Sequence, residues 1–100
     1  MQYNFEWNPQ KAYRNIRKHG VTFEEATKVF DDPMALTVFE DEESSNEEDR
    51  WITLGQINNQ SYLVVVHTDH NTNDDSVTIR LISARAATKH EIRQYERGQT

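Results

Sequence analysis

Hydrophobic residues recur at every second position in several segments of the chain, which is the pattern of strands buried on one face. The clearest example is Val77, Ile79 and Leu81. Segment 63–66 is instead apolar at every position, which indicates a central strand covered on both faces. These patterns predict strands at 3–7, 34–39, 50–57, 61–68 and 76–85.

Helix-capping residues frame a first helix at 9–19. Asn8 stands before proline at the predicted start, and Gly20 follows the predicted end. Asparagine caps helix starts, and glycine adopts the backbone conformation that ends a helix. Ala12 and Ile16 are one turn apart, so we expect them on the inner face of this helix.

Two further helices are predicted by capping boxes, in which a threonine and a glutamate three residues later bond each other's backbone N–H groups. Thr22 and Glu25 form one such pair, and Thr88 and Glu91 form the other. The helices are expected at 22–30 and 88–97.

The predicted elements follow the order β-α-α-β-β-β-β-α, which indicates an α+β fold. The pair Asn58-Asn59 and the polar segment 71–75 suit tight turns between neighbouring strands. We therefore expect an antiparallel sheet of about four strands plus a short N-terminal strand, with two N-terminal helices and one C-terminal helix. Residues 1–100 are expected to form a single domain, because this length suffices for one core only.

Composition excludes several classes of protein. The chain has no cysteine, which rules out a disulfide framework and a thiolate zinc site. No secretion signal opens the chain, and no segment has the length and apolarity of a membrane span. These features predict a cytoplasmic protein that does not associate with membranes.

The charge is unevenly distributed. The formal net charge is −6, but segment 40–49 holds seven of the seventeen acidic residues. The rest of the chain carries ten acidic residues against eleven lysines and arginines, so it is close to neutral. We interpret 40–49 as a solvated acidic loop, with docking on a basic surface as the alternative. Net charge therefore does not exclude an anionic partner.

Short motifs stand in order along the chain. They are Phe5-Glu6-Trp7-Asn8, Asn15 followed by Lys18-His19-Gly20, Phe23-Glu24-Glu25-Ala26, Phe30-Asp31-Asp32-Pro33, Arg50-Trp51-Ile52-Thr53-Leu54-Gly55, Val64-Val65-Val66-His67-Thr68 and Arg80-Leu81-Ile82-Ser83-Ala84-Arg85. With Glu91 and Tyr95 in the last helix, this ordered set resembles the BrnT toxin family over nearly the whole chain.

The resemblance implies a RelE-like fold and a ribonuclease toxin of a type II toxin–antitoxin pair. The implied partner is a BrnA-like antitoxin with a ribbon-helix-helix domain, and operator DNA would be bound only through that antitoxin. Ala86 stands where the family often has a basic residue, and segment 40–49 is unusually acidic. An alternative function is therefore a catalytically weak module that holds the antitoxin and co-represses the operon.

Arginines are the candidate groups for holding RNA phosphate. Cleavage of RNA without a metal needs cations that stabilise the phosphorane, and the planar guanidinium can hold two of its oxygens. Arg80, Arg85 and Arg50 are the candidates. A regular strand would send Arg80 and Arg85 to opposite faces, so they converge only if the strand bends or ends near Ser83-Ala84. The alternatives are an exposed sheet residue for Arg80, an anchor of the strand–helix corner through carbonyls or Glu91 for Arg85, and a pair with Asp49 or Glu48 for Arg50.

Proton transfer requires a base for the ribose 2′-hydroxyl and an acid for the leaving oxygen. His19 and His67 are candidates because imidazole titrates near neutral pH, and Tyr95 is a possible supporting donor. The alternatives are a helix C-cap for His19, a hydrogen-bonded core histidine for His67 and core packing for Tyr95.

Further basic residues near these positions are candidates for binding RNA. They are Lys18, Lys89 and Arg93. His67, Asp69 and His70 are close in sequence, but no second cluster of ligands accompanies them. We therefore predict no metal site and no cofactor.

Overall fold

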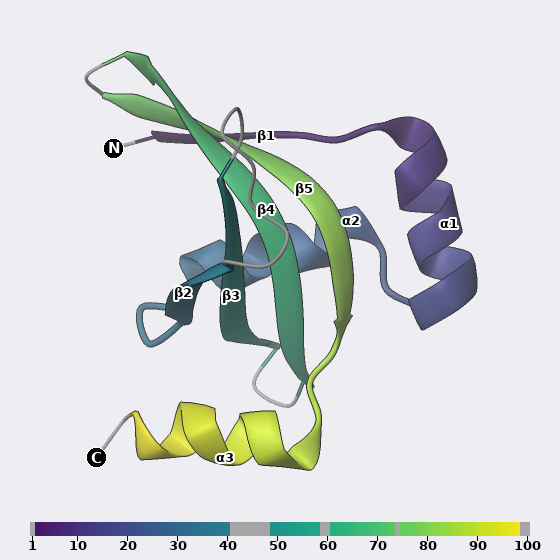
Figure 1. The fold of residues 1–100 in the computed structure, drawn as a ribbon, viewed down its shortest axis with the longest axis vertical. Helices are drawn as coiled ribbons and strands as arrows, with labels where there is room; N and C mark the ends of the chain where they lie inside the picture. The colour runs from purple at the N-terminus through teal and green to yellow at the C-terminus, as the bar shows by residue number, and fades with distance from the viewer. Residues whose placement is uncertain (1, 41–48, 59–60, 74, 99–100) are drawn as a thin grey trace.

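The computed structural model describes residues 2–40, 49–58, 61–73 and 75–98, and contains one mixed sheet with helices on both sides (Figure 1). The strands are β1 (Gln2–Glu6), β2 (Leu36–Glu40), β3 (Arg50–Ile57), β4 (Ser61–Asn73) and β5 (Ser76–Ala86). The helices are α1 (Pro9–His19), α2 (Phe23–Ala26), the 3-10 helix η1 (Thr27–Asp31) and α3 (Lys89–Arg97). None of the helices in the described segments is long and apolar enough to cross a membrane.

The strand order in the sheet is β1-β5-β4-β3-β2. Strands β2 to β5 pair antiparallel, as predicted, but β1 lies parallel to β5, with Phe5 opposite Ile79. The four expected antiparallel strands are therefore present, and the short N-terminal strand, for which no direction was predicted, makes the sheet mixed. The parallel neighbours β1 and β5 are not joined by a hairpin, which can connect only antiparallel strands. The chain instead leaves β1 through α1, α2 and η1 and crosses the sheet to β2 at the far edge.

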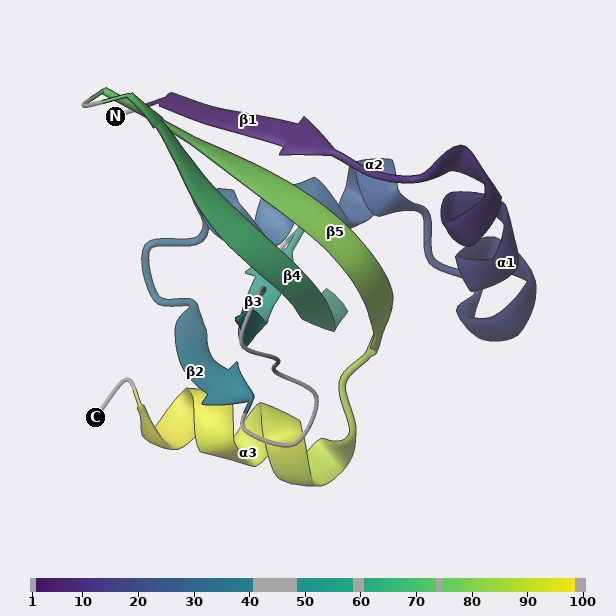
Figure 2. The ribbon, with the colours of Figure 1, turned by 45° about the horizontal axis from the view of Figure 1, so that its top comes forward.

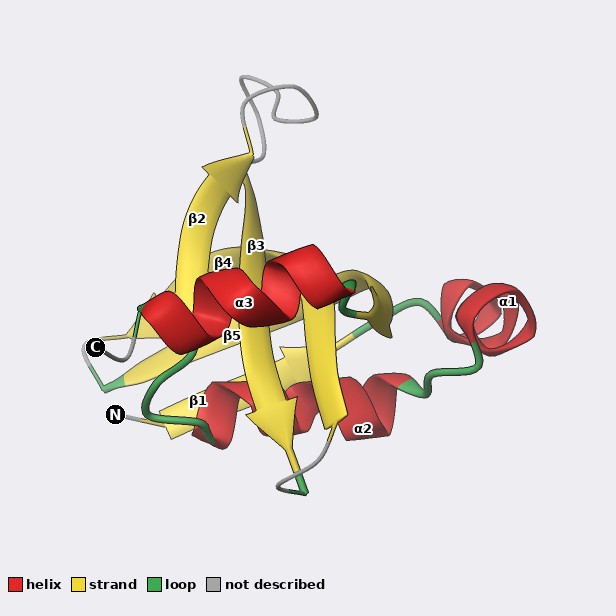
Figure 3. Ribbon diagram, turned by 90° about the horizontal axis from the view of Figure 1, so that it is seen from below, coloured by secondary structure: helices red, strands yellow, loops and turns green. Residues whose placement is uncertain are grey.

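The two faces of the sheet are covered by different helices (Figures 2 and 3). On the α2 face, Phe23, Ala26 and Val29 from α2 and η1 join Val65, Ile79, Leu81 and Ala84 of the sheet in the main core. On the α3 face, a smaller cluster joins Tyr95 of α3 to Leu54 and Val64. Helix α3 covers one end of its face, and α1 lies beside the part of β5 that extends past its pairing with β1 (Figure 1).

A β-bulge interrupts the pairing of β4 with β5. Val66 is opposite Ser83, whereas the next residue, His67, is opposite Leu81. Ile82 is thus an extra residue in β5, and it reverses the alternation of side chains beyond it. Ala84 consequently lies on the α2 face with Leu81, three positions away.

Several predicted boundaries needed correction. The helix expected at 22–30 is α-helical for four residues and continues as the 3-10 helix η1. Asp32 and Pro33 follow η1 and end the helical segment. Strand β4 extends to Asn73, because β5 supplies hydrogen-bonding partners along the polar residues predicted as a turn. Asn58 has the positive φ of 50° that suits a tight turn, while Asn59 and most of the acidic segment 40–49 lie outside the described residues.

The inner face of α1 also differs from the expectation. Ile16 is 44% exposed, and the buried residue of this helix is Asn15. Ala12 is half-buried against the main core, as expected. The hydrophobic period did not identify the contact face because α1 packs against the backbone edge of a strand, where an amide is more useful than an alkyl side chain.

Candidate functional site

Arg80 and Arg85 lie on the same face of the sheet. Their partners on β4 are Thr68 and Val64. These partners are four residues apart, and side chains alternate between the faces of a strand, so both lie on the same face. The bulge at Ile82 supplies the irregularity that places both arginines on one face. Both guanidinium groups therefore belong to the α3 face, which α3 covers at one end only.

Arg80 is paired at the edge of the sheet with Glu6 of β1. The Arg80 side chain is 40% exposed and that of Glu6 is 48% exposed. An ion pair in this much solvent contributes only about 0–1 kcal/mol. A phosphate oxygen could therefore replace the Glu6 carboxylate at little cost.

Arg85 is held more firmly, by two parallel hydrogen bonds of 2.8 Å to the carboxylate of Glu91. The hydrogen bonds from Arg85 lower the pKa of Glu91 to about 2, and the same pair raises the pKa of Arg85. Glu91 also accepts from the backbone N–H of Thr88 in the capping box of α3. Arg85 thus anchors the corner between β5 and α3, which is the structural alternative considered for it.

Arg50 is the first residue of β3 and lies opposite Glu40, the last residue of β2. Its side chain is half-buried, and its cross-strand neighbour Glu40 is a different residue from Asp49 and Glu48, the partners considered for it in the sequence. Arg50 directly follows the acidic segment 40–49 in the sequence.

His67 is buried in the α2 face, with 1% of its surface exposed. Its Nε2 lies 2.7 Å from the Thr53 hydroxyl, and its Nδ1 lies 2.6 Å from Asp69. Phe30 packs edge-on against the imidazole. The enclosed position of the ring favours the core interpretation, and the catalytic assignment of His67 stays a prediction.

Tyr95 is also enclosed. Its hydroxyl donates a 2.7 Å hydrogen bond to Asp32, and its ring packs edge-on against Tyr62. Burial, together with the Asp32 hydrogen bond, raises the pKa of Tyr95 to about 12, which makes it a poor proton donor at neutral pH. The contacts of Tyr95 therefore favour core packing over proton donation.

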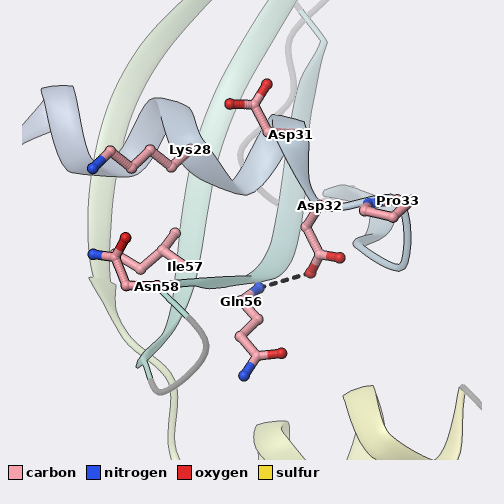
Figure 4. A pocket seen from close by; sticks show the side chains of 7 residues that line it. All are labelled: Lys28, Asp31, Asp32, Pro33, Gln56, Ile57 and Asn58. Carbon is pink, nitrogen blue, oxygen red and sulfur yellow. Dashed lines mark hydrogen bonds between the residues drawn. The ribbon is translucent and has the colours of Figure 1, made fainter.

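Asp32 lines an open depression of about 410 Å³ (Figure 4). Burial tends to raise its pKa, but hydrogen bonds from the backbone of Gln56, from Tyr95 and from Met34 outweigh this and lower it. Lys28 lines the same depression, and Figure 4 shows the Asp32 carboxylate directed toward the Gln56 backbone. The carboxylate joins η1, β3 and α3, so we assign it a structural role.

Lys18 and His19, two of the predicted residues, line a groove of about 170 Å³ between α1 and β5. Lys11 and Arg14 of α1 line it as well, and Ile82 and Ser83 form its wall on β5. Sequence reasoning missed Lys11 and Arg14. The available signal was their spacing. Arg14 is three residues after Lys11, and Lys18 is four residues after Arg14, which places all three on one helix face.

Lys89 and Arg93 are exposed on α3, one turn apart and away from the α1–β5 groove. Of the three residues weighed as metal ligands in the sequence, His67 and Asp69 bond each other, while His70 is the next residue along β4 and points to the opposite face. Within the described ranges no three His, Asp or Glu side chains gather in a group that could hold a metal ion.

Comparison with known proteins identifies relatives of this architecture. A family model described as the ribonuclease toxin BrnT of type II toxin–antitoxin systems matches residues 7–91. The crystal structure of the Brucella abortus ribonuclease toxin BrnT superimposes with a TM-score of 0.62 at 19% identity, covering 89% of this chain and 100% of that one. No curated protein sequence matches. The family match confirms the resemblance noted in the sequence, and the superposition shows a similar α+β fold.

Proposed function

The chain belongs to the BrnT family of ribonuclease toxins of type II toxin–antitoxin systems, and on that premise we propose that it cleaves mRNA as a metal-independent endoribonuclease. The observation that carries the proposal is the bulge at Ile82, which brings Arg80 and Arg85 to one open face of the sheet. A guanidinium on this face can stabilise the phosphorane, and a second one about 13 Å along the strand can contact a neighbouring phosphate.

Arg80 is the first cation that a phosphate would engage. Its pair with Glu6 is exposed and weak, whereas Arg85 is committed to two bonds with Glu91 and to the carbonyl of Ala86. Arg80 would donate hydrogen bonds to the scissile phosphate, and Arg85 would contribute positive charge only where a phosphate displaces the Glu91 carboxylate. Arg50 supplies a further cation at the β2–β3 end.

His19 is the candidate for proton transfer. It is exposed at the end of α1 and lines the α1–β5 groove beside Ser83, the residue after the bulge at Ile82. An exposed imidazole can exchange protons with both the ribose hydroxyl and water. His67 and Tyr95 are left out of the proposed site because each is buried and bonded to other side chains.

The proposed partner is a BrnA-like antitoxin with a ribbon-helix-helix domain, which would neutralise the toxin and carry the complex to operator DNA in the cytoplasm. A RelE-like arrangement of the catalytic face is part of the same proposal. Family membership supports an antitoxin partner in general.

The test is induced expression of the chain in a bacterial host, with and without its adjacent gene, with growth and RNA integrity read together. Growth arrest with loss of RNA, rescued by the neighbour, is expected. Arg80→Gln should relieve the arrest, and the exposed Arg97→Gln should not. Normal growth with intact RNA from folded protein would contradict the proposal.

The second candidate function is a catalytically weak module that holds the antitoxin and co-represses the operon. The commitment of Arg85 to Glu91 favours it, because this arginine contributes less to phosphate binding while the pair is intact. Folded protein that binds the neighbour's product, without degrading RNA, would favour this function over the first.

A further inference from the structure

We propose that the α1–β5 groove binds the sugar-phosphate backbone of single-stranded RNA. The groove is lined by Lys11, Arg14, Lys18 and His19 on one side and by Ile82 and Ser83 on the other. The inference deepens the proposed ribonuclease function, on which it rests, by naming the surface that holds the substrate next to the cleaving groups.

The charge of α1 is the first argument. The helix contains five basic residues, counting His19, and no acidic residue, in a chain of net charge −6. Lys11, Arg14 and Lys18 form no ion pair with the described parts of the chain, in contrast to Arg80 and Arg85. Their charges are therefore available to an external anion.

The spacing of these cations is the second argument. Lys11, Arg14 and Lys18 lie on one face and span about 10 Å along the helix axis at 1.5 Å per residue. A row of this length can contact more than one phosphate of an extended strand. Arg17 lies on a different face, where its guanidinium stacks over the ring of Tyr13.

The groove is also rigid. The Asn15 amide joins α1 to the β5 backbone through two hydrogen bonds with Ala84. A third hydrogen bond, to the Val21 carbonyl, fixes the segment that follows α1. Gly20, with a φ of 70°, ends the helix in a left-handed conformation. Cations on a fixed helix lose less conformational entropy on binding than cations on a loop.

The lining favours backbone contacts over base reading. Among the described residues that line the groove there is no phenylalanine, tyrosine or tryptophan, the large rings on which successive bases stack, so phosphate contacts dominate there. Contacts to phosphate alone carry no sequence information. RNA is favoured over other polyanions because Arg80, the proposed cleaving cation, is two residues before Ile82 on the same strand.

The test measures binding of a fluorescent single-stranded 2′-O-methyl oligoribonucleotide by anisotropy at several salt concentrations. This probe lacks the attacking hydroxyl, so binding is measured whether or not the protein cleaves RNA. The groove variant is Lys11→Gln with Arg14→Gln. The matched control is Arg17→Gln with Lys28→Gln, which removes the same charge from surfaces outside the groove.

The groove variant should bind on the order of tenfold more weakly, with a salt slope flatter by about 1.4, since each lost phosphate contact removes about 0.7 for a single strand. The control should stay within about twofold of the wild type, because it removes charge without removing contacts. Equal losses in both variants would attribute binding to net charge and overturn the proposal.

Two further outcomes separate this inference from the proposed function. If the wild type binds the probe through the groove but leaves unmodified RNA intact, the ribonuclease function fails and the groove assignment stands. If a polyglutamate peptide of equal charge displaces the probe more efficiently than unlabelled RNA does, the groove binds acidic protein and the RNA assignment is wrong.

Discussion

The side-chain amide of Asn15 pairs with the backbone of Ala84 in the manner of a neighbouring strand. Its Oδ1 accepts from the Ala84 N–H at 3.0 Å, and its Nδ2 donates to the Ala84 carbonyl at 2.8 Å. Strand β1 ends at Glu6, opposite Arg80, so no strand pairs with this side of β5 at Ala84. One helical side chain therefore satisfies a buried strand edge and fixes the position of α1.

Replacing Asn15 with leucine should destabilise the protein by about 3 kcal/mol, because it leaves the buried Ala84 groups and the Val21 carbonyl without partners. Urea denaturation followed by tryptophan fluorescence measures the change. Gln10→Ala on the exposed side of α1 should stay within about 0.5 kcal/mol. An equal and small effect of both substitutions would contradict the anchoring role.

The pair of Arg85 with Glu91 should make stability depend on acidity. The pKa of Glu91 is about 2 in the folded protein against an ordinary value of 4.5. Its contribution is therefore complete above pH 4.5 and is lost as the pH falls toward 2. We expect this loss to be on the order of 1–2 kcal/mol, because solvent screens the partly exposed pair.

Glu91→Gln isolates this effect, since glutamine can keep the capping-box bond while the ion pair is removed. The variant should be less stable than the wild type at pH 7, and the difference should shrink toward pH 2. Glu24→Gln, at an exposed carboxylate of α2, should follow the wild-type curve. Parallel acid curves for Glu91→Gln and the wild type would contradict the assignment.

The two histidines should separate stability from activity. His67→Gln should cost about 1–3 kcal/mol because it disrupts the bonds to Thr53 and Asp69, while the folded fraction keeps cleaving RNA. His19→Gln should leave stability within about 0.5 kcal/mol and reduce cleavage on the order of 10²-fold, the usual contribution of an acid–base group. Cleavage per folded molecule and urea denaturation measure both. A folded but inactive His67→Gln would reverse the assignment.

Gly55 allows close contact between β3 and η1. A Cβ at this position would lie 2.8 Å from the Cβ of Val29 and 3.2 Å from its backbone. Gly55→Ala should therefore cost about 1–3 kcal/mol in thermal or chemical unfolding. At Gly98 the nearest atom is the flexible end of Leu36, so Gly98→Ala should stay within about 0.5 kcal/mol. Similar losses at both positions would argue against tight packing at η1.

Much of the fold followed from the sequence. All three predicted helix starts are capped as expected, with Asn8, Thr22 and Thr88 accepting backbone N–H bonds. Alternation located every strand to within a few residues, except that β4 continued well beyond its predicted end. Caps and alternation depend on residues a few positions apart, so a local pattern was sufficient.

The candidate site was less accessible to sequence reasoning. The sequence showed which residue types could act in the site. Whether His19 is exposed and His67 enclosed depends on which elements pack over them. The single domain over 1–100 and the catalytic assignments stay predictions.

The helix caps and the strand periods follow from residues near one another along the chain, where steric and hydrogen-bonding preferences act without regard to distant segments. The family follows from the order of short motifs along nearly the whole chain. The parallel pairing of β1 with β5 joins segments about seventy residues apart, and the bulge at Ile82 arises from the fit of β5 to β4. The partners of Arg80 and Arg85 likewise follow from packing. Long-range pairing reflects competition among all strands and helices for the same core, which no local pattern encodes.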